Sequence, residues 1–117
     1  TYLIFPGNCE EAVKHYCDVF GGEVLFSQKY GDAPVNASPD WKNKIMHTSF
    51  KVRDAEIMAS DADPAHMPTV GNNVQISVNF RKEEKIDGMF EKLAQGGKIT
   101  MPLDKTFWGA YFGMLVD

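Results

Sequence analysis

Two segments of the chain repeat one pattern of apolar and polar positions. Each places an i, i+3, i+4, i+7 apolar stripe after a pair of glutamates, which predicts an amphipathic helix. The stripes are Val13, Tyr16, Cys17, Phe20 and Ile86, Met89, Phe90, Leu93. Asn8 is predicted to cap the first helix. Both stripes end near a glycine pair, at residues 21–22 and 96–97, which predicts a left-handed helix end followed by a strand. The sequence therefore predicts a duplication.

Apolar or alternating runs around the two helices predict strands. They are residues 1–5, 23–30, 44–52 and 55–61 in the first half, and 74–80, 98–101 and 111–117 in the second. Two segments rich in Pro, Gly and Asn, residues 31–40 and 62–73, are predicted loops, and the first is a candidate rim or lid. The order is β-α-β-β-β followed by β-α-β-β, so the last strand of the second half is expected to be missing.

The alternation within these strands predicts two faces. The set suited to the helix-covered core face is Met46, Thr48, Phe50, Val52, Ile76, Val78 and Phe80. Ile45 and Lys51 are predicted on the open face, and Glu56, Met58 and Ser60 on one face of their strand. Two curled sheets set side by side would leave a cleft lined by the polar sets. The residues predicted to line it are His47, Ser49, Gln75, Ser77 and Asn79.

Composition narrows the classes of partner. The 117 residues suffice for one modest domain, and the net charge of -4 lacks the basic character of nucleic-acid binding proteins. No apolar run approaches the roughly 20 residues of a membrane span, so no membrane partner is expected. Cys9 and Cys17 lie about 12 Å apart along one predicted helix, too far for a disulfide. Two structural, reduced cysteines favour a cytoplasmic protein.

Four motifs give the chain a resemblance to a known family. They are GNCEEAVKHYCDVFGGEV at 7–24, KIMHTSF at 44–50, EIMASD at 56–61 and GGKITMPLDKTFWGAYFGMLVD at 96–117. The sequence resembles the PhnB-like branch of the vicinal oxygen chelate superfamily, the glyoxalase/bleomycin-resistance/dioxygenase fold. The resemblance implies a single α+β domain over 1–117 with two βαβββ modules, about 1–62 and about 73–117. Curled mixed sheets would carry the helices on their outer face, around a small-molecule cleft, commonly in a homodimer.

The resemblance also implies positions for a divalent metal. Catalytic members of the superfamily take one His, Gln or Glu ligand from each of the first, fourth, fifth and eighth strands. These positions fall at Thr1, Met58 and Gln75, with the eighth-strand position beyond Asp117. Among the three, Gln75 is a ligand type. No cofactor is therefore expected, and Gln75 and His47 are weak metal candidates. A metal-dependent lyase, isomerase or dioxygenase is the alternative function.

Some members of the branch are described by similarity as demethylubiquinone methyltransferases. Both glycine pairs follow helices, so neither forms a glycine-rich strand-to-helix loop for an adenosyl group, and methyltransferase activity is not expected. The first hypothesis is a protein that binds a small, partly apolar or aromatic ligand in the cleft. The predicted ligand-binding residues are His47, Gln75, Ser77 and Trp108. Whether it transforms or merely sequesters that ligand is an open alternative.

Three residue groups carry alternative interpretations. His47 suits general acid-base chemistry or simply fills a sheet face with one hydrogen bond. Trp108 stacks on a planar ligand or covers a sheet edge or dimer seam. Asp61 and Asp63 resemble an acidic pair but favour an ordinary turn. The run Phe107, Trp108, Tyr111 and Phe112 is too apolar to lie bare, which predicts a two-fold homodimer.

Overall fold

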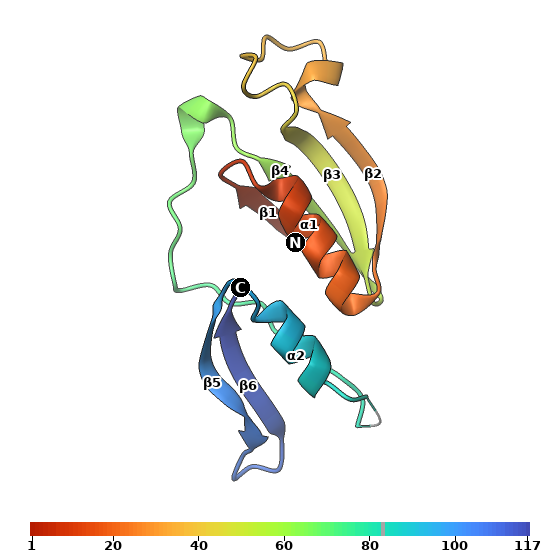
Figure 1. Cartoon of the computed structure of the whole chain (residues 1–117), viewed down its shortest axis with the longest axis vertical. Helices are drawn as coiled ribbons and strands as arrows, with labels where there is room; N and C mark the ends of the chain where they lie inside the picture. Colours follow the sequence, from red (N-terminus) through yellow and green to blue (C-terminus); the bar gives the residue numbers. More distant parts are fainter. Residues whose placement is uncertain (83) are drawn as a thin grey trace. The chain divides into compact units, whose positions relative to one another are not determined.

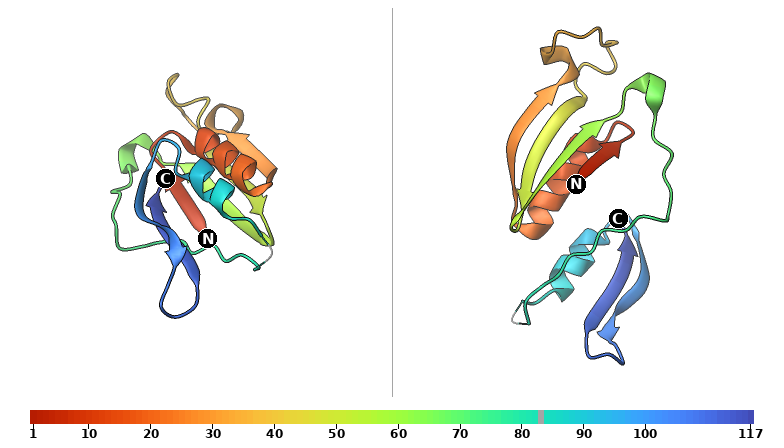
Figure 2. Two further views of the ribbon diagram at one scale, coloured as in Figure 1. Left: turned by 60° about the horizontal axis from the view of Figure 1, so that its bottom comes forward. Right: turned by 180° about the vertical axis from the view of Figure 1, so that it is seen from behind.

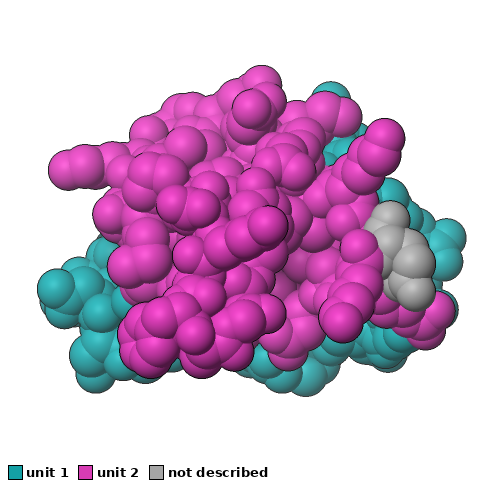
Figure 3. All heavy atoms as spheres, turned by 90° about the horizontal axis from the view of Figure 1, so that it is seen from below, with its two compact units in different colours: residues 1–75 teal, residues 76–117 magenta. Residues whose placement is uncertain are grey.

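The computed structural model describes residues 1–82 and 84–117. The chain divides into two compact units, Thr1–Gln75 and Ile76–Asp117, coloured separately in Figure 3.

The first unit is a four-stranded mixed sheet with one helix. Its elements are β1 (Tyr2–Phe5), α1 (Cys9–Phe20), β2 (Glu23–Lys29), β3 (Ile45–Val52) and β4 (Ala55–Asp61), with short 3₁₀ turns at Tyr30–Asp32 and Pro64–His66. The strand order is β1-β4-β3-β2, with β1 parallel to β4 and the other pairs antiparallel. The helix covers one face of the sheet (Figure 1), and the opposite face is seen from behind (Figure 2, right). The predicted βαβββ order is confirmed.

The core lies between α1 and this sheet. Its buried apolar members are Cys9, Val13, Ile45, Phe50, Val52 and Ala59, with Leu3, Phe5, Tyr16, Cys17, Phe20 and Ile57 packed against them. The ring of Tyr16 stacks on Phe50 at a centroid distance of 6.4 Å. The predicted helix stripe therefore faces the sheet, as an amphipathic helix requires.

Ile45 corrects the predicted faces of β3. It was assigned to the open face, but its side chain is 2% exposed and belongs to the core. Gln28 pairs with His47, and the next residue, Lys29, pairs with Ile45, so β3 carries one extra residue, Met46. Such a bulge reverses the alternation beyond it, which a strict period of two does not anticipate.

Asp61 is a buried structural carboxylate, which corrects its interpretation as an ordinary turn residue. It ends β4, is 2% exposed, and its Oδ1 accepts the backbone N–H of Cys9 at 2.9 Å. Its Oδ2 accepts the backbone N–H of Ile45 at 2.8 Å. Asn8 occupies the cap position of α1 but makes no side-chain cap hydrogen bond. Asp61 therefore satisfies the first turn of the helix from a distant strand, and its charge suits the positive helix end.

The second unit contains α2 (Asp87–Leu93), β5 (Lys98–Lys105) and β6 (Tyr111–Val116). β5 and β6 form a two-stranded antiparallel sheet. The predicted strand at 74–80 is wrong, because these residues belong to no strand. The predicted strand at 98–101 is too short, because β5 continues through Pro102 to Lys105. A proline is compatible with a strand at the edge of a sheet, where fewer ladder bonds are needed.

The glycine pairs confirm the duplication in three dimensions. The first glycine of the pairs 21–22 and 96–97 has φ of 68° and 79°, respectively, in the left-handed region. A Cβ on Gly22 would lie 2.2 Å from the carbonyl oxygen of Lys51, and a Cβ on Gly97 would lie 2.0 Å from the carbonyl oxygen of Val116. The chain crosses the neighbouring strand so closely that a side chain is excluded in both halves.

The following hairpins also match. In the first unit the register pairs are Glu23–Lys51, Val24–Phe50 and Phe26–Ser49. The corresponding pairs in the second unit, in the same order, are Lys98–Val116, Ile99–Leu115 and Met101–Met114. A register shift falls between the second and third pair of each set. β5 and β6 are therefore the counterparts of β2 and β3.

Candidate functional site

The candidate site is the face of the first unit's sheet that lies opposite α1, called here the open face. Directly paired residues share a face, and those paired with core residues point to the helix. The open face therefore consists of Tyr2 and Ile4 from β1, Phe26 and Gln28 from β2, His47 and Ser49 from β3, and Met58 and Ser60 from β4. It combines aromatic, thioether and small polar groups.

A hydrogen bond joins Tyr2 and His47 across this face. The Tyr2 hydroxyl lies 3.1 Å from His47 Nδ1, and the ring centroids are 5.7 Å apart. β4 separates β1 from β3 in the sheet, so the Tyr2 side chain spans β4 to make this contact. The bond occupies Nδ1 and holds the imidazole in one orientation, with Nε2 as the second polar atom of the ring.

Phe26 extends this pair into a row of three rings. Its centroid lies 6.1 Å from that of His47 at an interplanar angle of 43°. The rings of Tyr2, His47 and Phe26 thus come from β1, β3 and β2. Tyr2 is 46% exposed and Phe26 51% exposed, so ring surface is available to a ligand within this unit. Met58, the register partner of Tyr2, adds an adaptable thioether.

The structure places the four predicted ligand-binding residues differently. His47 lies half-buried on the open face. Gln75 and Ser77 are exposed and belong to no strand, so the strand expected to aim them into a cleft is not formed. Asn79, also predicted to line the cleft, is likewise exposed outside any strand. Trp108 lies in the turn between β5 and β6 of the second unit and is 62% exposed.

Tyr2 and Phe26 were not singled out by the sequence patterns. Residues 1–5 form a continuous apolar run, so the alternation that sends Tyr2 and Ile4 to one face and Leu3 and Phe5 to the other is hidden. In β2 the register shift beside Phe26 interrupts the alternation in the same way. The signal that could have identified Tyr2 is its hydroxyl group, which stands in the otherwise apolar strand β1.

The open face includes Met58, one of the positions that the resemblance implies for a metal. The first-strand position was expected at Thr1, and the residue that pairs with Met58 on the open face is Tyr2. A phenol and a thioether are poor ligands for the divalent ions that imidazole and carboxylate hold. Across residues 1–82 and 84–117, no group of three or more His, Cys, Asp or Glu side chains is arranged for metal binding.

The two cysteines form no disulfide with each other. Both are free, and Cys9 is fully buried in the core while Cys17 is half-buried. Burial, with smaller contributions from Asp61 and Glu10, raises the pKa of the Cys9 thiol to about 12. Burial, followed by Asp18 and Glu23, also raises the pKa of Cys17. Raised pKa values suppress the thiolate, so neither thiol has the character of a catalytic nucleophile.

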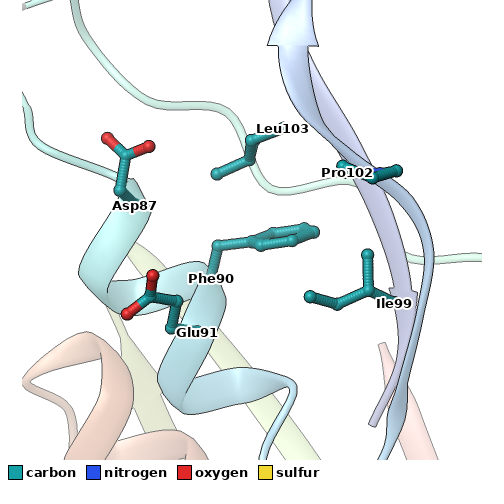
Figure 4. A pocket seen from close by; sticks show the side chains of 6 residues that line it. All are labelled: Asp87, Phe90, Glu91, Ile99, Pro102 and Leu103. Atoms are coloured by element: carbon teal, nitrogen blue, oxygen red, sulfur yellow. The ribbon is translucent and has the colours of Figure 1, made fainter.

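A hollow of about 230 Å³ lies between α2 and β5 in the second unit (Figure 4). It is lined by Asp87, Phe90, Glu91, Ile99, Pro102 and Leu103. The Phe90 ring points from α2 toward the strand (Figure 4). Nearby, the Tyr111 hydroxyl donates to Asp87 Oδ1 at 2.6 Å, and this bond, ahead of desolvation, raises the pKa of Tyr111. The hollow is mostly apolar, without converging polar groups.

Exposed aromatic residues gather on the hairpin of β5 and β6. Phe107 is 97% exposed and meets Trp108 edge-on at a centroid distance of 4.8 Å. Trp108 lies 6.4 Å from Phe112. The turn is held by Thr106, whose Oγ1 accepts the N–H of Ala110 at 3.0 Å. The name aromatic hairpin is used below for Phe107, Trp108 and Phe112.

A family model of the Glyoxalase/Bleomycin resistance protein/Dioxygenase superfamily matches residues 1–117. The chain belongs to this superfamily. Its helix-and-mixed-sheet architecture agrees with the glyoxalase-like fold, and its sheets are not closed. The resemblance to PhnB-like proteins is confirmed by the relatives that follow.

Three relatives of this superfamily member cover nearly all of the chain. Protein PA1353 from Pseudomonas aeruginosa is 42% identical with a TM-score of 0.87, over 99% of this chain and 86% of its own. A structure from Bacillus cereus named as a putative 3-demethylubiquinone-9 3-methyltransferase, PhnB protein, is 32% identical with a TM-score of 0.81, over 98% and 87%. Protein YjdN of Escherichia coli strain K12 is 29% identical over 126 residues, which is 99% of this chain and 85% of YjdN.

Within the part of the chain that the structure describes, no helix combines the length and the apolar character that crossing a membrane requires.

Proposed function

We propose that this superfamily member binds a small, partly aromatic molecule on the open face, against the rings of Tyr2, His47 and Phe26. The observation that carries the proposal is the hydrogen bond between the Tyr2 hydroxyl and His47 Nδ1. A polar pair set among exposed rings matches the usual composition of a small-molecule site, in which apolar walls surround a few oriented polar groups. A reduced, cytoplasmic location is part of the proposal and agrees with two free cysteines.

The proposed ligand contacts follow from the geometry of the three rings. Tyr2 holds Nδ1, so His47 meets the ligand through Nε2. Phe26, tilted by 43° to the imidazole, offers a face or edge to a planar group. An aromatic contact of this kind contributes about 0.5–1.5 kcal/mol beyond the area it buries. Ser49, the register partner of Phe26, supplies a small hydroxyl beside the ring.

The alternative, a metal-dependent lyase, isomerase or dioxygenase, has less support. Its weak ligand candidates were Gln75 and His47. Gln75 is exposed outside any strand, and His47 uses Nδ1 toward Tyr2. The donor set of Tyr2 and Met58 gives a hard or borderline cation little to bind. The proposal is therefore binding without a metal tetrad.

The test is a titration of the whole chain with a panel of aromatic and quinone-like compounds, followed by NMR of the His47 imidazole and the backbone. Binding should shift resonances of Tyr2, Phe26 and His47. Phe26→Ser should weaken binding at least tenfold, because it removes one wall of the site. Val35→Ser is the matched control, since Val35 is 48% exposed against 51% for Phe26 but lies in the loop before β3.

Two results would count against the proposal. One is a set of shifted resonances confined to other surfaces, and the other is equal binding by Phe26→Ser and Val35→Ser. Elemental analysis of protein purified without chelator addresses the alternative, because near-stoichiometric Zn, Mn, Fe or Ni would favour metal chemistry. Incubation with a bound compound, followed by product analysis, separates transformation from sequestration.

A further inference from the structure

Two buried hydroxyl groups lie on the open face without a protein partner. Ser49 on β3 and Ser60 on β4 are each 9% exposed. Among the residues that the structure describes, neither hydroxyl forms a hydrogen bond. The neighbouring Thr48, on the helix-covered face, donates its hydroxyl to the carbonyl oxygen of Phe26 at 2.7 Å. The sheet therefore pairs this buried hydroxyl on its core face and leaves two unpaired on the face proposed for the ligand.

An unpaired buried hydroxyl lowers the stability of a protein, because it loses contact with water and gains no new partner. Such groups are rare in folded proteins and are concentrated at functional sites. Both serine oxygens remain reachable from the open face, since the wholly enclosed unpaired side-chain atom in the described part of the chain is His15 Nε2. A bound molecule on the open face can therefore supply the missing hydrogen bonds.

The register of the strands places the two hydroxyls around His47. Ser49 pairs with Met58 and lies two residues from His47 on β3, while Ser60 lies two residues from Met58 on β4. Ser49 and Ser60 are therefore diagonal neighbours, and such residues lie roughly 7–8 Å apart. The rings of Tyr2 and Phe26 approach His47 from β1 and β2. Polar groups thus lie at the centre of the face and aromatic rings at its sides.

The open face offers no counter-charge to a charged ligand. Its residues, all within the described part of the chain, carry no carboxylate, ammonium or guanidinium group. Lys51 lies farther along β3, and this residue and its register partners Glu23 and Glu56 are all exposed. A charged group placed over the two serines would lose its hydration without gaining an opposite charge. The face therefore favours a neutral polar group.

We infer that the ligand of the open face is an uncharged planar molecule with an amide-type edge, a carboxamide or a lactam, held by Ser49, Ser60 and His47. This inference rests on the proposed function and specifies its ligand. An amide presents a donor beside an acceptor, and each serine hydroxyl can both donate and accept. His47 contributes Nε2, since its Nδ1 is bonded to the Tyr2 hydroxyl. The rings of Tyr2 and Phe26 contact the planar part of the molecule.

The experiment compares three probes of one shape and different charge. The full chain is titrated at pH 8 with neutral benzamide, negative benzoate and positive benzamidinium, and NMR follows the resonances of Tyr2, Phe26 and His47. Benzamide should shift them with a Kd at least tenfold below that of either charged probe. Equal or tighter binding of a charged probe at these residues would overturn the inference and leave the proposed function standing. Absence of binding by all three would overturn the inference, and the wider panel of aromatic compounds then decides whether the proposed function fails with it.

Serine variants test the two hydroxyls directly. Ser49→Ala and Ser60→Ala should each raise the Kd of benzamide roughly three- to tenfold, because each removes one hydrogen bond to the ligand. Without ligand, the Tm of both variants should be unchanged or higher, because an unpaired buried hydroxyl is removed. Ser27→Ala is the matched control, since exposed Ser27 follows Phe26 on β2 but pairs with Thr48 of the helix-covered face. Unchanged benzamide affinity in either variant, or a lower Tm that reveals a structural role, would overturn the inference.

Discussion

The carboxylate of Asp61 holds the backbone N–H of Cys9 at 2.9 Å, so the end of β4 caps the start of α1. Asp61→Ala should therefore lower the free energy of unfolding by roughly 3–5 kcal/mol, because it leaves the buried backbone N–H groups of Cys9 and Ile45 without their acceptor. Asp63→Ala is the control, since exposed Asp63 accepts a single N–H from Ala65 at 2.8 Å and should cost about 1 kcal/mol. Urea unfolding followed by circular dichroism measures both, and similar losses would contradict the assigned role.

The second glycine of each helix-ending pair should tolerate no side chain. Gly22→Ala and Gly97→Ala each place a Cβ against a strand carbonyl oxygen, at 2.2 Å and 2.0 Å, and should destabilise the protein by about 3 kcal/mol or prevent folding. Gly88→Ala should instead stabilise it by about 0.5–1 kcal/mol, because Gly88 lies in α2 with nothing within 4 Å of an added Cβ. Thermal unfolding compares the three, and a stable Gly22→Ala variant would show that the close approach is wrong.

The buried Cys9 thiol predicts a loss of stability at alkaline pH. Its pKa is about 12 in the folded chain against 9.0 for the ordinary thiol, so the unfolded chain releases the proton first. The free energy of unfolding should therefore fall as pH rises from about 9 toward 12. Cys9→Ala lacks this contribution, and its stability should fall less steeply over the same range. The midpoints of urea unfolding between pH 8 and 11 compare the wild-type chain with Cys9→Ala, and parallel curves for the two would contradict the prediction.

The aromatic hairpin predicts self-association. Phe107 and Trp108 are 97% and 62% exposed, and we propose that a second copy covers them in a two-fold dimer. Sedimentation at micromolar concentration should give twice the chain mass of 13.1 kDa, and Trp108→Ser should shift the protein to the monomer. Val70→Ser, at a residue 85% exposed outside the aromatic hairpin, should leave the dimer unchanged. A monomeric wild-type chain would remove this prediction.

The sequence predicts those parts of the fold in which local pattern and local structure coincide. The helix stripe at Val13, Tyr16 and Cys17 and the glycine pair at 21–22 depend on nearby residues, and the structure confirms both. Ile45 was misplaced because a bulge depends on the partner strand, which a single strand's alternation does not reveal. Asp61 was misread for a similar reason, since its two N–H partners lie 52 and 16 positions away in the chain.

The candidate site was less predictable than the fold. His47 was identified from its place in an alternating strand, but its partner Tyr2 lies 45 residues away on a strand that is not its neighbour. Gln75 and Ser77 were assigned from a strand pattern that needs a sheet neighbour to form. Sequence alternation reports which residues could form a strand, whereas the strand itself requires hydrogen-bond partners elsewhere.

Pro102 hinders the pairing of a further strand with the outer edge of β5. A proline carries no backbone N–H, and the pairing of β5 with β6 is irregular between Met101 and Asp104, on either side of it. The outer edge of β5 is therefore a poor template for further strands, whereas the β6 edge has no proline between Tyr111 and Val116. Addition of a strand at the β5 edge is disfavoured, which guards against the edge-to-edge pairing that leads from exposed strands to fibrils.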